Sequence, residues 1–176
     1  KPLRDFFARN GMEMIEALRV DTHGGSLRGI VQLAGGPRDV GASVNELIAL
    51  EAELGLDRPE MLKTFSAQID GLKNELRILL VDLKGEGKKI AGYGAPAKAT
   101  TLMSFFGIGQ ELIDYLIDES PLKQGLFSQG HHIPVVPPSA LCDPRHRPDY
   151  AVVLAWNFAE SILKRHQQFL DTGGHF

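Results

Sequence analysis

Apolar residues recur at strand spacing near the start of the chain. Residues 2–9 predict a short helix, and residues 12–34 predict two strands around the turn "THGGS". The second strand, residues 26–34, alternates apolar and polar positions and is rich in β-formers. "GGPRD" ends this region, and no further strand follows nearby. Because a two-stranded sheet is only marginally stable alone, we expect this hairpin to be the edge of a sheet whose remainder is missing.

The spacing then changes to that of helices. In residues 41–56, Ser43 is the expected N-cap and Glu46, three residues later, its capping-box partner. Residues 57–86 predict one long helix with Asp57 as its cap and Pro59 in its first turn. Such a helix exceeds the average length in globular proteins and is expected to bridge two parts of a larger molecule. Its apolar stripe consists of Met61, Leu62, Phe65, Ile69, Leu72, Leu76, Leu79 and Leu80.

Strand and helix patterns alternate from Lys88 to the end of the chain. Predicted strands cover residues 88–93, 113–120, 132–136 and 149–156, and predicted helices cover residues 97–107 and 158–171. The final "TGGHF" reads as the start of another strand. This alternation favours an α/β fold, a Rossmann-like parallel sheet with helices on both faces, preceded by the long helix and the small β segment left from an upstream domain.

Composition and charge exclude several classes of partner and site. The net charge is −3 and no lysine- or arginine-rich run is present, so we expect no nucleic-acid partner. No apolar run approaches the length of a membrane span. Cys142 is the single cysteine, which excludes an internal disulfide and a thiolate metal cage and fits a cytoplasmic setting. The adjacent His131 and His132 point to opposite faces of a strand and have no third ligand in reach, so no metal site is predicted.

The stretch "KKIAGYGAPAKATTL" is the strongest candidate for a binding turn. Gly92 and Gly94 allow a tight turn and a close approach to an anion, and Pro96 suits the first turn of a helix. Lys98 lies one turn into that helix, where its charge reaches a phosphate. The alternative is a turn that only packs the helix on the strand. The third glycine of the dinucleotide fingerprint is absent, because Ala97 stands in its place.

Other polar residues are expected at the same edge of the sheet, since each follows a predicted strand. Asp118 comes 24 residues after Gly94, a spacing typical of the acid that accepts from a ribose hydroxyl. Lys123 belongs to the loop after that strand, and Asn157 ends the fourth strand. His23 in "THGGS" is a candidate acid–base group, with a plain hairpin turn as the alternative.

Five stretches together resemble the carboxyl-terminal part of the S-adenosylmethionine-dependent nucleotide-sugar C-methyltransferases, from about Met12 to Phe176. They are "HGGSLR", "GYGAPAKATTL", "IDYLIDESPLKQG", "HIPVVPPSAL" and "PDYAVVLAWNFAESIL", in this order. The resemblance implies a full-length enzyme with an amino-terminal zinc domain, a central methyl-donor domain and a carboxyl-terminal Rossmann-like domain. Zinc and most of the S-adenosylmethionine site would then lie outside this chain.

The resemblance implies three segments. Residues 1–40 are the end of the methyl-donor domain, residues 41–86 are a helical connector and residues 87–176 are the Rossmann-like domain. The chain would bind a nucleotide diphosphate deoxysugar and would not methylate it alone, with His23 as an acid–base group. The implied substrate-binding residues are Gly92, Tyr93, Gly94, Ala95, Lys98, Asp118, Lys123 and Asn157. An NAD-dependent oxidoreductase domain and a non-catalytic nucleotide-binding module are the alternatives, and no oligomeric state is predicted.

Overall fold

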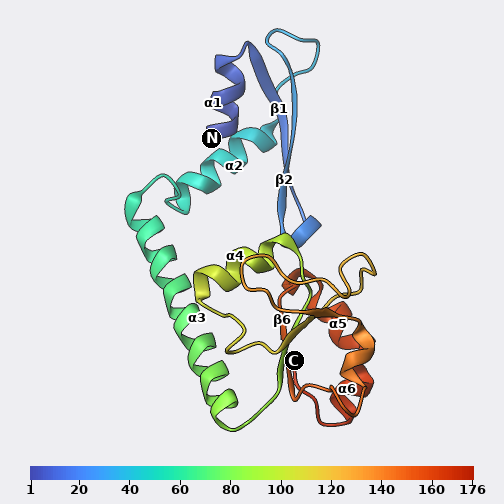
Figure 1. The fold of residues 1–176 in the computed structure, drawn as a ribbon. Helices are drawn as coiled ribbons and strands as arrows, with labels where there is room; N and C mark the ends of the chain where they lie inside the picture. Colours follow the sequence, from blue (N-terminus) through green and yellow to red (C-terminus); the bar gives the residue numbers. More distant parts are fainter. The chain divides into compact units, whose positions relative to one another are not determined.

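The structure, a computed structural model, describes residues 1–176 and consists of two compact units (Figure 1). Unit 1 comprises Lys1–Gln68 and unit 2 comprises Ile69–Phe176. None of the helices combines the length and the apolar character that crossing a membrane requires.

Unit 1 is a β-hairpin with two helices packed on it. The hairpin strands are antiparallel, as the alternating pattern predicted, and they flank a 3-10 turn at Thr22–Gly24. Buried Met14, Ala17 and Val44 form its small core. In chain order its elements are α1 (Pro2–Arg9), β1 (Met12–Val20), β2 (Ser26–Leu33) and α2 (Ala42–Glu53).

Ser43 has a different role from the predicted one. α2 begins at Ala42 with Gly41 as its N-cap, and no side chain caps it. The Ser43 hydroxyl oxygen instead accepts a hydrogen bond from the Ala17 N–H of β1, at 3.2 Å. The predicted capping box is therefore wrong, because this serine bonds to a neighbouring strand in place of its own helix end.

Unit 2 contains a parallel sheet of four strands in the order β5-β4-β3-β6. This confirms the predicted α/β fold. A parallel bridge between Tyr150 and His175 marks the strand expected at the chain's end. The strand order reverses at β3, with β4 and β5 on one side of it and β6 on the other. The strands are β3 (Ile90–Tyr93), β4 (Tyr115–Ile117), β5 (Val135–Val136) and β6 (Tyr150–Val153).

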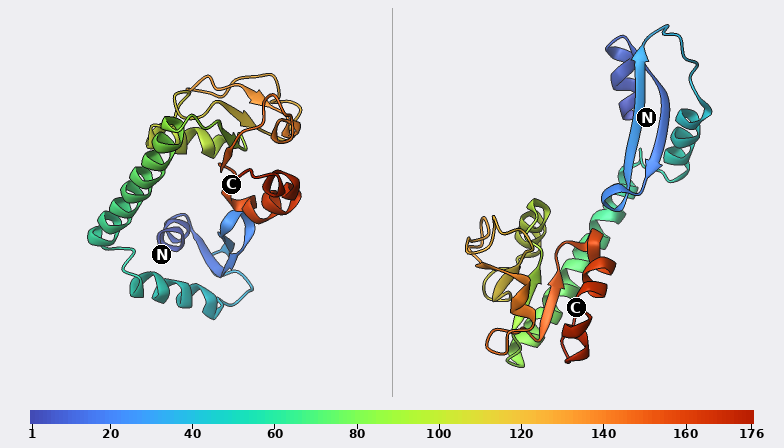
Figure 2. Two further views of the ribbon diagram at one scale, coloured as in Figure 1. Left: turned by 90° about the horizontal axis from the view of Figure 1, so that it is seen from below. Right: turned by 90° about the vertical axis from the view of Figure 1, so that its right-hand side faces the viewer.

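Helices cover both faces of this sheet (Figures 1 and 2). Side chains of β3 alternate between two cores, with Ile90 in one and Ala91 in the other. The Ile90 core includes Leu80 of α3 and Met103 of α4, and the Ala91 core includes Phe169 of α6. These helices are α3 (Pro59–Gly85), α4 (Ala97–Phe106), α5 (Ala159–Arg165) and α6 (Gln167–Asp171).

The predicted single helix over residues 158–171 is two helices. His166 separates α5 from α6 with non-helical angles, φ −108° and ψ 35°. Its ring reaches the hydroxyl of Tyr93 at the end of β3, 2.6 Å away. The break between the helices allows the His166 ring to contact Tyr93. Ile162 of α5 and Phe169 of α6 still pack in one core on the same face of the sheet.

The apolar stripe of α3 is buried only at the end of the helix. Leu80 and Leu83 are 1% and 7% exposed, whereas Leu62, Phe65 and Leu72 are 62%, 56% and 59% exposed. The pattern therefore predicted the helix correctly, but most of its stripe is solvent-exposed in this chain.

Candidate functional site

The turn between β3 and α4 lies where the strand order reverses, and its glycines are sterically required. Gly94 has φ +95°, and a Cβ there would lie 2.7 Å from the Ala155 Cβ after β6. A Cβ at Gly92 would lie 2.6 Å from a Leu116 methyl group and 2.7 Å from a Leu154 methyl group. Both glycines thus serve close packing, and Gly94 lets the loops after β3 and β6 touch at the point where doubly wound sheets bind ligands.

Asp118 holds this turn in place from the end of β4. Its carboxylate accepts hydrogen bonds from the Ala95 N–H at 2.7 Å and the Ser120 N–H at 2.9 Å. Lys123 Nζ lies 3.1 Å from the same carboxylate and donates to the Ala95 carbonyl at 3.0 Å. Asp118 is only 9% exposed, so its carboxylate stabilises the turn from the protein interior.

These contacts set the charge of Asp118. Burial by itself raises the pKa of the carboxyl, but the hydrogen bonds from Ser120, Ala95 and Lys123 lower that pKa below its usual value. The aspartate is thus ionised at neutral pH.

The first turn of α4 leaves donors for a ligand. The Gly94 N–H donates to the Ile117 carbonyl at 2.7 Å, whereas the N–H groups of Ala97 and Lys98 have no acceptor in the protein. These N–H groups lie at the positive end of the helix dipole, which favours an anion. Two backbone donors of the predicted anion-binding turn thus remain available to a ligand. The N–H groups of Gly94 and Ala95 are already hydrogen-bonded within the protein.

Lys98 adds a charged side chain to the same first turn of α4. Its Nζ lies 4.0 Å from the centre of the Trp156 ring, in a cation–π contact between α4 and the turn after β6. Asn157 is the next residue in that turn, Trp156–Phe158. The structure therefore brings Lys98 to the loop that carries Asn157. The sequence predicted this proximity, because both residues follow strands whose carboxyl ends share one edge of the sheet.

Two hollows flank this turn on opposite sides of the strand reversal. The first, which we call the α4 cavity, measures about 290 Å³ and lies beside β4 and β5. Its lining includes two of the predicted residues, Ala95 and Lys123. The second hollow adjoins α5 and is lined by Trp156, Asn157 and Lys164 among others.

Tyr93 belongs to a polar network on the α5–α6 face. Its hydroxyl donates to Glu119 Oε1 at 3.0 Å and lies 2.6 Å from His166 Nε2, and Arg165 pairs with Glu119. Tyr93 is 3% exposed, and burial, followed by the bond to Glu119, raises the pKa of its hydroxyl. Sequence reasoning missed Glu119, Arg165 and His166, because only the packing of α5 on the sheet brings them to Tyr93.

The network makes the stability of unit 2 depend on pH. Burial lowers the pKa of His166 below its usual value, with Arg165 adding to this effect and Glu119 opposing it. The unfolded chain therefore binds a proton at this position at a higher pH than the folded chain does. The contribution of His166 to the free energy of unfolding is therefore fully present above the unfolded pKa of about 6.5. It is lost as the pH drops below that value and through the folded pKa.

We expect a His166→Gln variant to lose less stability than the parent when the pH falls from 7 to 5. Urea unfolding followed by Trp156 fluorescence measures this in unit 2, since Trp156 is the single tryptophan. Asp118, whose pKa is lowered, adds a separate loss only at more acidic pH, as the pH falls below its unfolded pKa of about 3.9 and through its folded value. Equal losses for parent and variant between pH 7 and 5 would contradict the assignment to His166.

His23 lies in unit 1, in the turn between β1 and β2. It is exposed and has a positive φ of 56°. Positive φ values are uncommon outside glycine, but histidine, like asparagine and aspartate, adopts them more often than most residues do. Its acid–base role stays a prediction.

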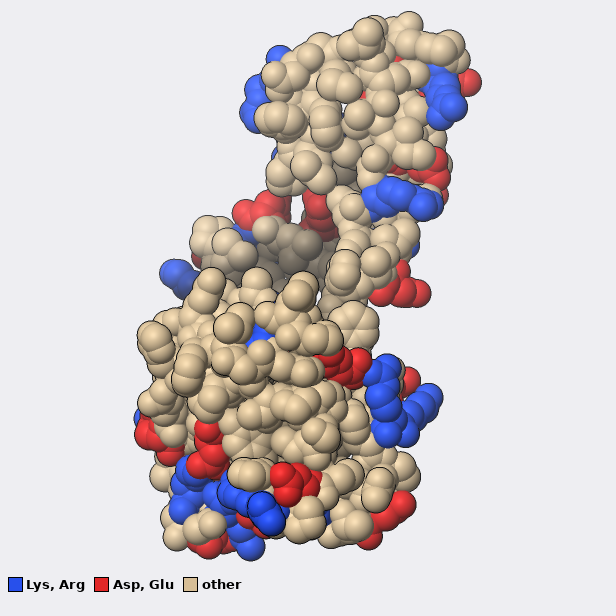
Figure 3. All heavy atoms as spheres, turned by 45° about the vertical axis from the view of Figure 1, so that its right-hand side comes forward, with Lys and Arg blue, Asp and Glu red and all other residues tan.

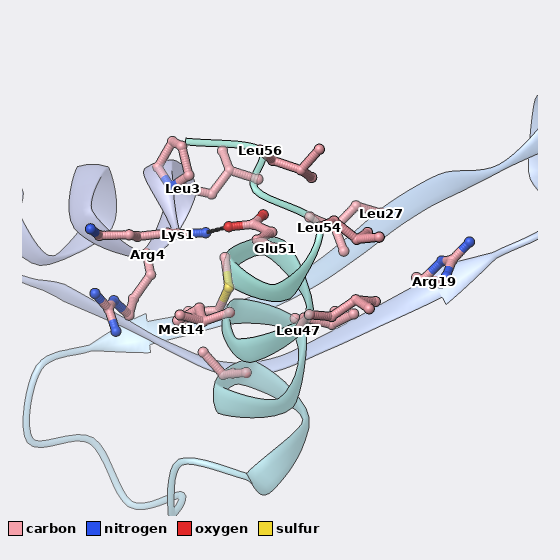
Figure 4. Close-up of a pocket in the computed structure, with 15 residues that line it drawn as sticks. Lys1, Leu3, Arg4, Met14, Arg19, Leu27, Leu47, Glu51, Leu54 and Leu56 are labelled. Atoms are coloured by element: carbon pink, nitrogen blue, oxygen red, sulfur yellow. Dashed lines mark hydrogen bonds and ion pairs between the residues drawn. The ribbon is translucent and has the colours of Figure 1, made fainter. Parts of the chain in front are cut away.

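Unit 1 carries an apolar groove of about 450 Å³ (Figure 4). Leucines of α1, β2 and α2 and Met14 of β1 point into it. This lining suits an apolar surface better than a phosphate, so unit 2 is the candidate for nucleotide binding.

Two arrangements of side chains bear on metal and nucleic-acid sites. No group of three or more histidine, cysteine, aspartate or glutamate residues is arranged to hold a metal ion. Acidic and basic side chains intermingle on the face of the molecule in Figure 3, without the basic stripe that marks nucleic-acid binding.

Comparisons with known proteins agree on one family. Residues 21–176 match the family model described as the C-methyltransferase C-terminal domain. The chain is also 32% identical over 170 residues to the protein named C-methyltransferase NovU from Streptomyces niveus. That alignment covers 97% of this chain and 40% of NovU, so the chain spans less than half the length of this relative.

Proposed function

The chain belongs to the C-methyltransferase C-terminal domain family, and from that premise we propose that it binds the substrate of an S-adenosylmethionine-dependent C-methyltransferase. The proposed substrate is a nucleotide-linked deoxysugar. The chain alone binds this substrate without methylating it, because the central methyl-donor domain supplies the rest of the active site.

One observation carries the proposal. Lys98 and the two N–H groups of Ala97 and Lys98 that lack acceptors belong to the first turn of α4, where the strand order reverses. A diphosphate carries two or more negative charges, and such a helix start stabilises them through backbone donors and the helix dipole. Asp118 and Lys123 then act as positioning residues, since both hold Ala95 and therefore the turn.

Methylation at carbon requires a base to remove a proton next to a sugar keto group and a methyl donor aligned with that carbon. S-adenosylmethionine supplies the methyl group when bound. Its reactive sulfur is cationic and it has no phosphate, so the positive turn of α4 does not suit it. In this chain, the residues around Lys98 hold and orient the nucleotide end of the substrate, and His23 is the candidate for the proton transfer.

Calorimetric titration of the chain with four ligands tests this proposal. We expect binding of a nucleoside diphosphate sugar and of the matching nucleoside diphosphate. NAD is expected to bind more weakly, because Asp118, the acid expected to accept from a ribose hydroxyl, is already bonded to Ala95, Ser120 and Lys123. S-adenosylmethionine is expected to show no measurable binding.

A methyl-transfer assay with radiolabelled S-adenosylmethionine and the nucleotide sugar completes the test. No product is expected from the chain alone. Tight binding of NAD with no binding of nucleotide sugars would favour the oxidoreductase alternative, and methyl transfer by the chain alone would refute the division of labour.

A further inference from the structure

The α4 cavity adjoins the proposed diphosphate position. It opens between the first turns of α4 and the segment 123–131, on the β4–β5 side of the strand reversal. Pro96 and Ala97 belong to its wall, and Ala97 also provides one of the N–H groups that lack an acceptor. The α4 cavity therefore shares Ala97 with the proposed diphosphate position.

The floor of the α4 cavity is apolar. Met103, Leu116 and Val135 line it and are 1%, 1% and 4% exposed. Phe127, which is 61% exposed, provides an aromatic side chain in its wall. No aspartate or glutamate lines the cavity. A flat, uncharged heterocycle matches this lining better than a sugar, whose hydroxyl groups need many polar partners.

Polar groups with unused hydrogen-bonding capacity lie at the rim. The Gln129 side-chain amide and the Thr100 hydroxyl have no hydrogen-bond partner in the protein. A glutamine amide presents a donor and an acceptor side by side, which matches the edge of a nucleobase. Lys123 also lines the cavity, but its ammonium group already contacts Asp118 and Ala95.

The segment that carries Phe127 and Gln129 is held in shape by backbone bonds. Phe127 bridges Pro134 in an antiparallel pair, and the Ser128 N–H donates to the Ile133 carbonyl at 2.8 Å. The Val135 N–H donates to the Leu126 carbonyl at 2.9 Å. A wall ordered in this way lowers the entropy cost of binding.

We propose that the α4 cavity holds the heterocyclic base of the nucleotide, with Phe127 stacking on it and Gln129 bonding to its edge. This inference rests on the proposed function and places the nucleoside on the β4–β5 side of the strand reversal. The sugar then extends toward Trp156 and Asn157 on the β6 side, in the second hollow.

The test compares Phe127→Ala, Gln129→Ala and Lys98→Ala with the parent chain. The ligands are uridine diphosphate, thymidine diphosphate, guanosine diphosphate and inorganic pyrophosphate, titrated by calorimetry. Phe127→Ala is expected to weaken the preferred nucleoside diphosphate about tenfold, on the scale of base–aromatic stacking, and to leave pyrophosphate affinity unchanged. Gln129→Ala is expected to reduce the preference among the three bases.

Lys98→Ala serves as the opposite control, because it is expected to weaken all four ligands. Phe127→Leu keeps an apolar side chain without the aromatic face, and a matching loss in this variant assigns the effect to stacking. Thermal unfolding followed by Trp156 fluorescence identifies any variant that fails to fold.

The outcomes separate this inference from the proposed function. If Phe127→Ala and Gln129→Ala bind nucleoside diphosphates as the parent does while Lys98→Ala does not, the base lies elsewhere and the diphosphate site stands. If the parent binds neither nucleoside diphosphates nor pyrophosphate, the proposed function fails and this inference fails with it.

Discussion

Replacing Gly94 by alanine is expected to lower the free energy of unfolding of unit 2 by about 2–5 kcal/mol. About 1–2 kcal/mol comes from forcing a residue with a Cβ into the left-handed region, since φ at this position is +95°. Overpacking against Ala155, whose Cβ would lie 2.7 Å away, adds about 1–3 kcal/mol. Urea unfolding followed by Trp156 fluorescence measures the loss.

Gly173→Ala is the matched control for this prediction. Gly173 has a similar φ of +84°, but a Cβ there would have no neighbour within 4 Å. Its cost is therefore the backbone strain alone, about 1–2 kcal/mol. Equal losses in the two variants would contradict the close approach of the loops after β3 and β6.

Gly94→Ala is also expected to weaken nucleotide binding. The new methyl group pushes Ala155 away, and Trp156, the next residue, carries the ring that contacts Lys98. Calorimetry on folded Gly94→Ala measures this effect, and unchanged affinity would separate the packing of the turn from its binding role.

Lys98→Ala is expected to weaken binding of a nucleoside diphosphate sugar by about 1–3 kcal/mol, or roughly five- to 150-fold. The loss follows from removing the charge of the helix turn whose Ala97 and Lys98 N–H groups are proposed to bind the diphosphate. Because salt screens such an interaction, the parent should lose more affinity than the variant when ionic strength rises. Titration calorimetry at two salt concentrations measures both effects.

Lys73→Ala provides a control with similar geometry. Lys73 Nζ lies 4.9 Å from the centre of the Phe105 ring, as Lys98 Nζ lies 4.0 Å from that of Trp156. Each variant removes one cation–π contact, so each is expected to lose at most about 1 kcal/mol of stability. Only Lys98→Ala is expected to change affinity, and equal affinity for Lys98→Ala and the parent would sink the phosphate role.

The exposed part of the α3 stripe shows that a sequence pattern predicts a helix but not which of its residues are buried. The spacing of Leu62, Phe65 and Leu72 correctly predicted a helix, because helix formation depends on local periodicity. Burial of the same residues depends on what packs against them, and they are more than half exposed here.

The α/β fold, the hairpin, the glycine turn and the family resemblance that the comparisons confirmed were all predictable from the sequence. These features depend on local periodicity, on turn residues and on ordered motifs, all of which are present in the linear chain. The convergence of Lys98 and the Asn157 loop at one sheet edge was also predictable, since the carboxyl ends of parallel strands share an edge.

The hydrogen-bond partners of the polar side chains could not be predicted from the sequence, because they depend on how the elements pack together. Asp118 bonds to the Ala95 N–H beneath the turn, Ser43 bonds to β1 instead of capping α2, and His166 interrupts a helix to reach Tyr93. The partner in each case comes from a different element of the fold. A polar side chain bonds to whichever group packing brings within about 3 Å, and local sequence does not encode that distance.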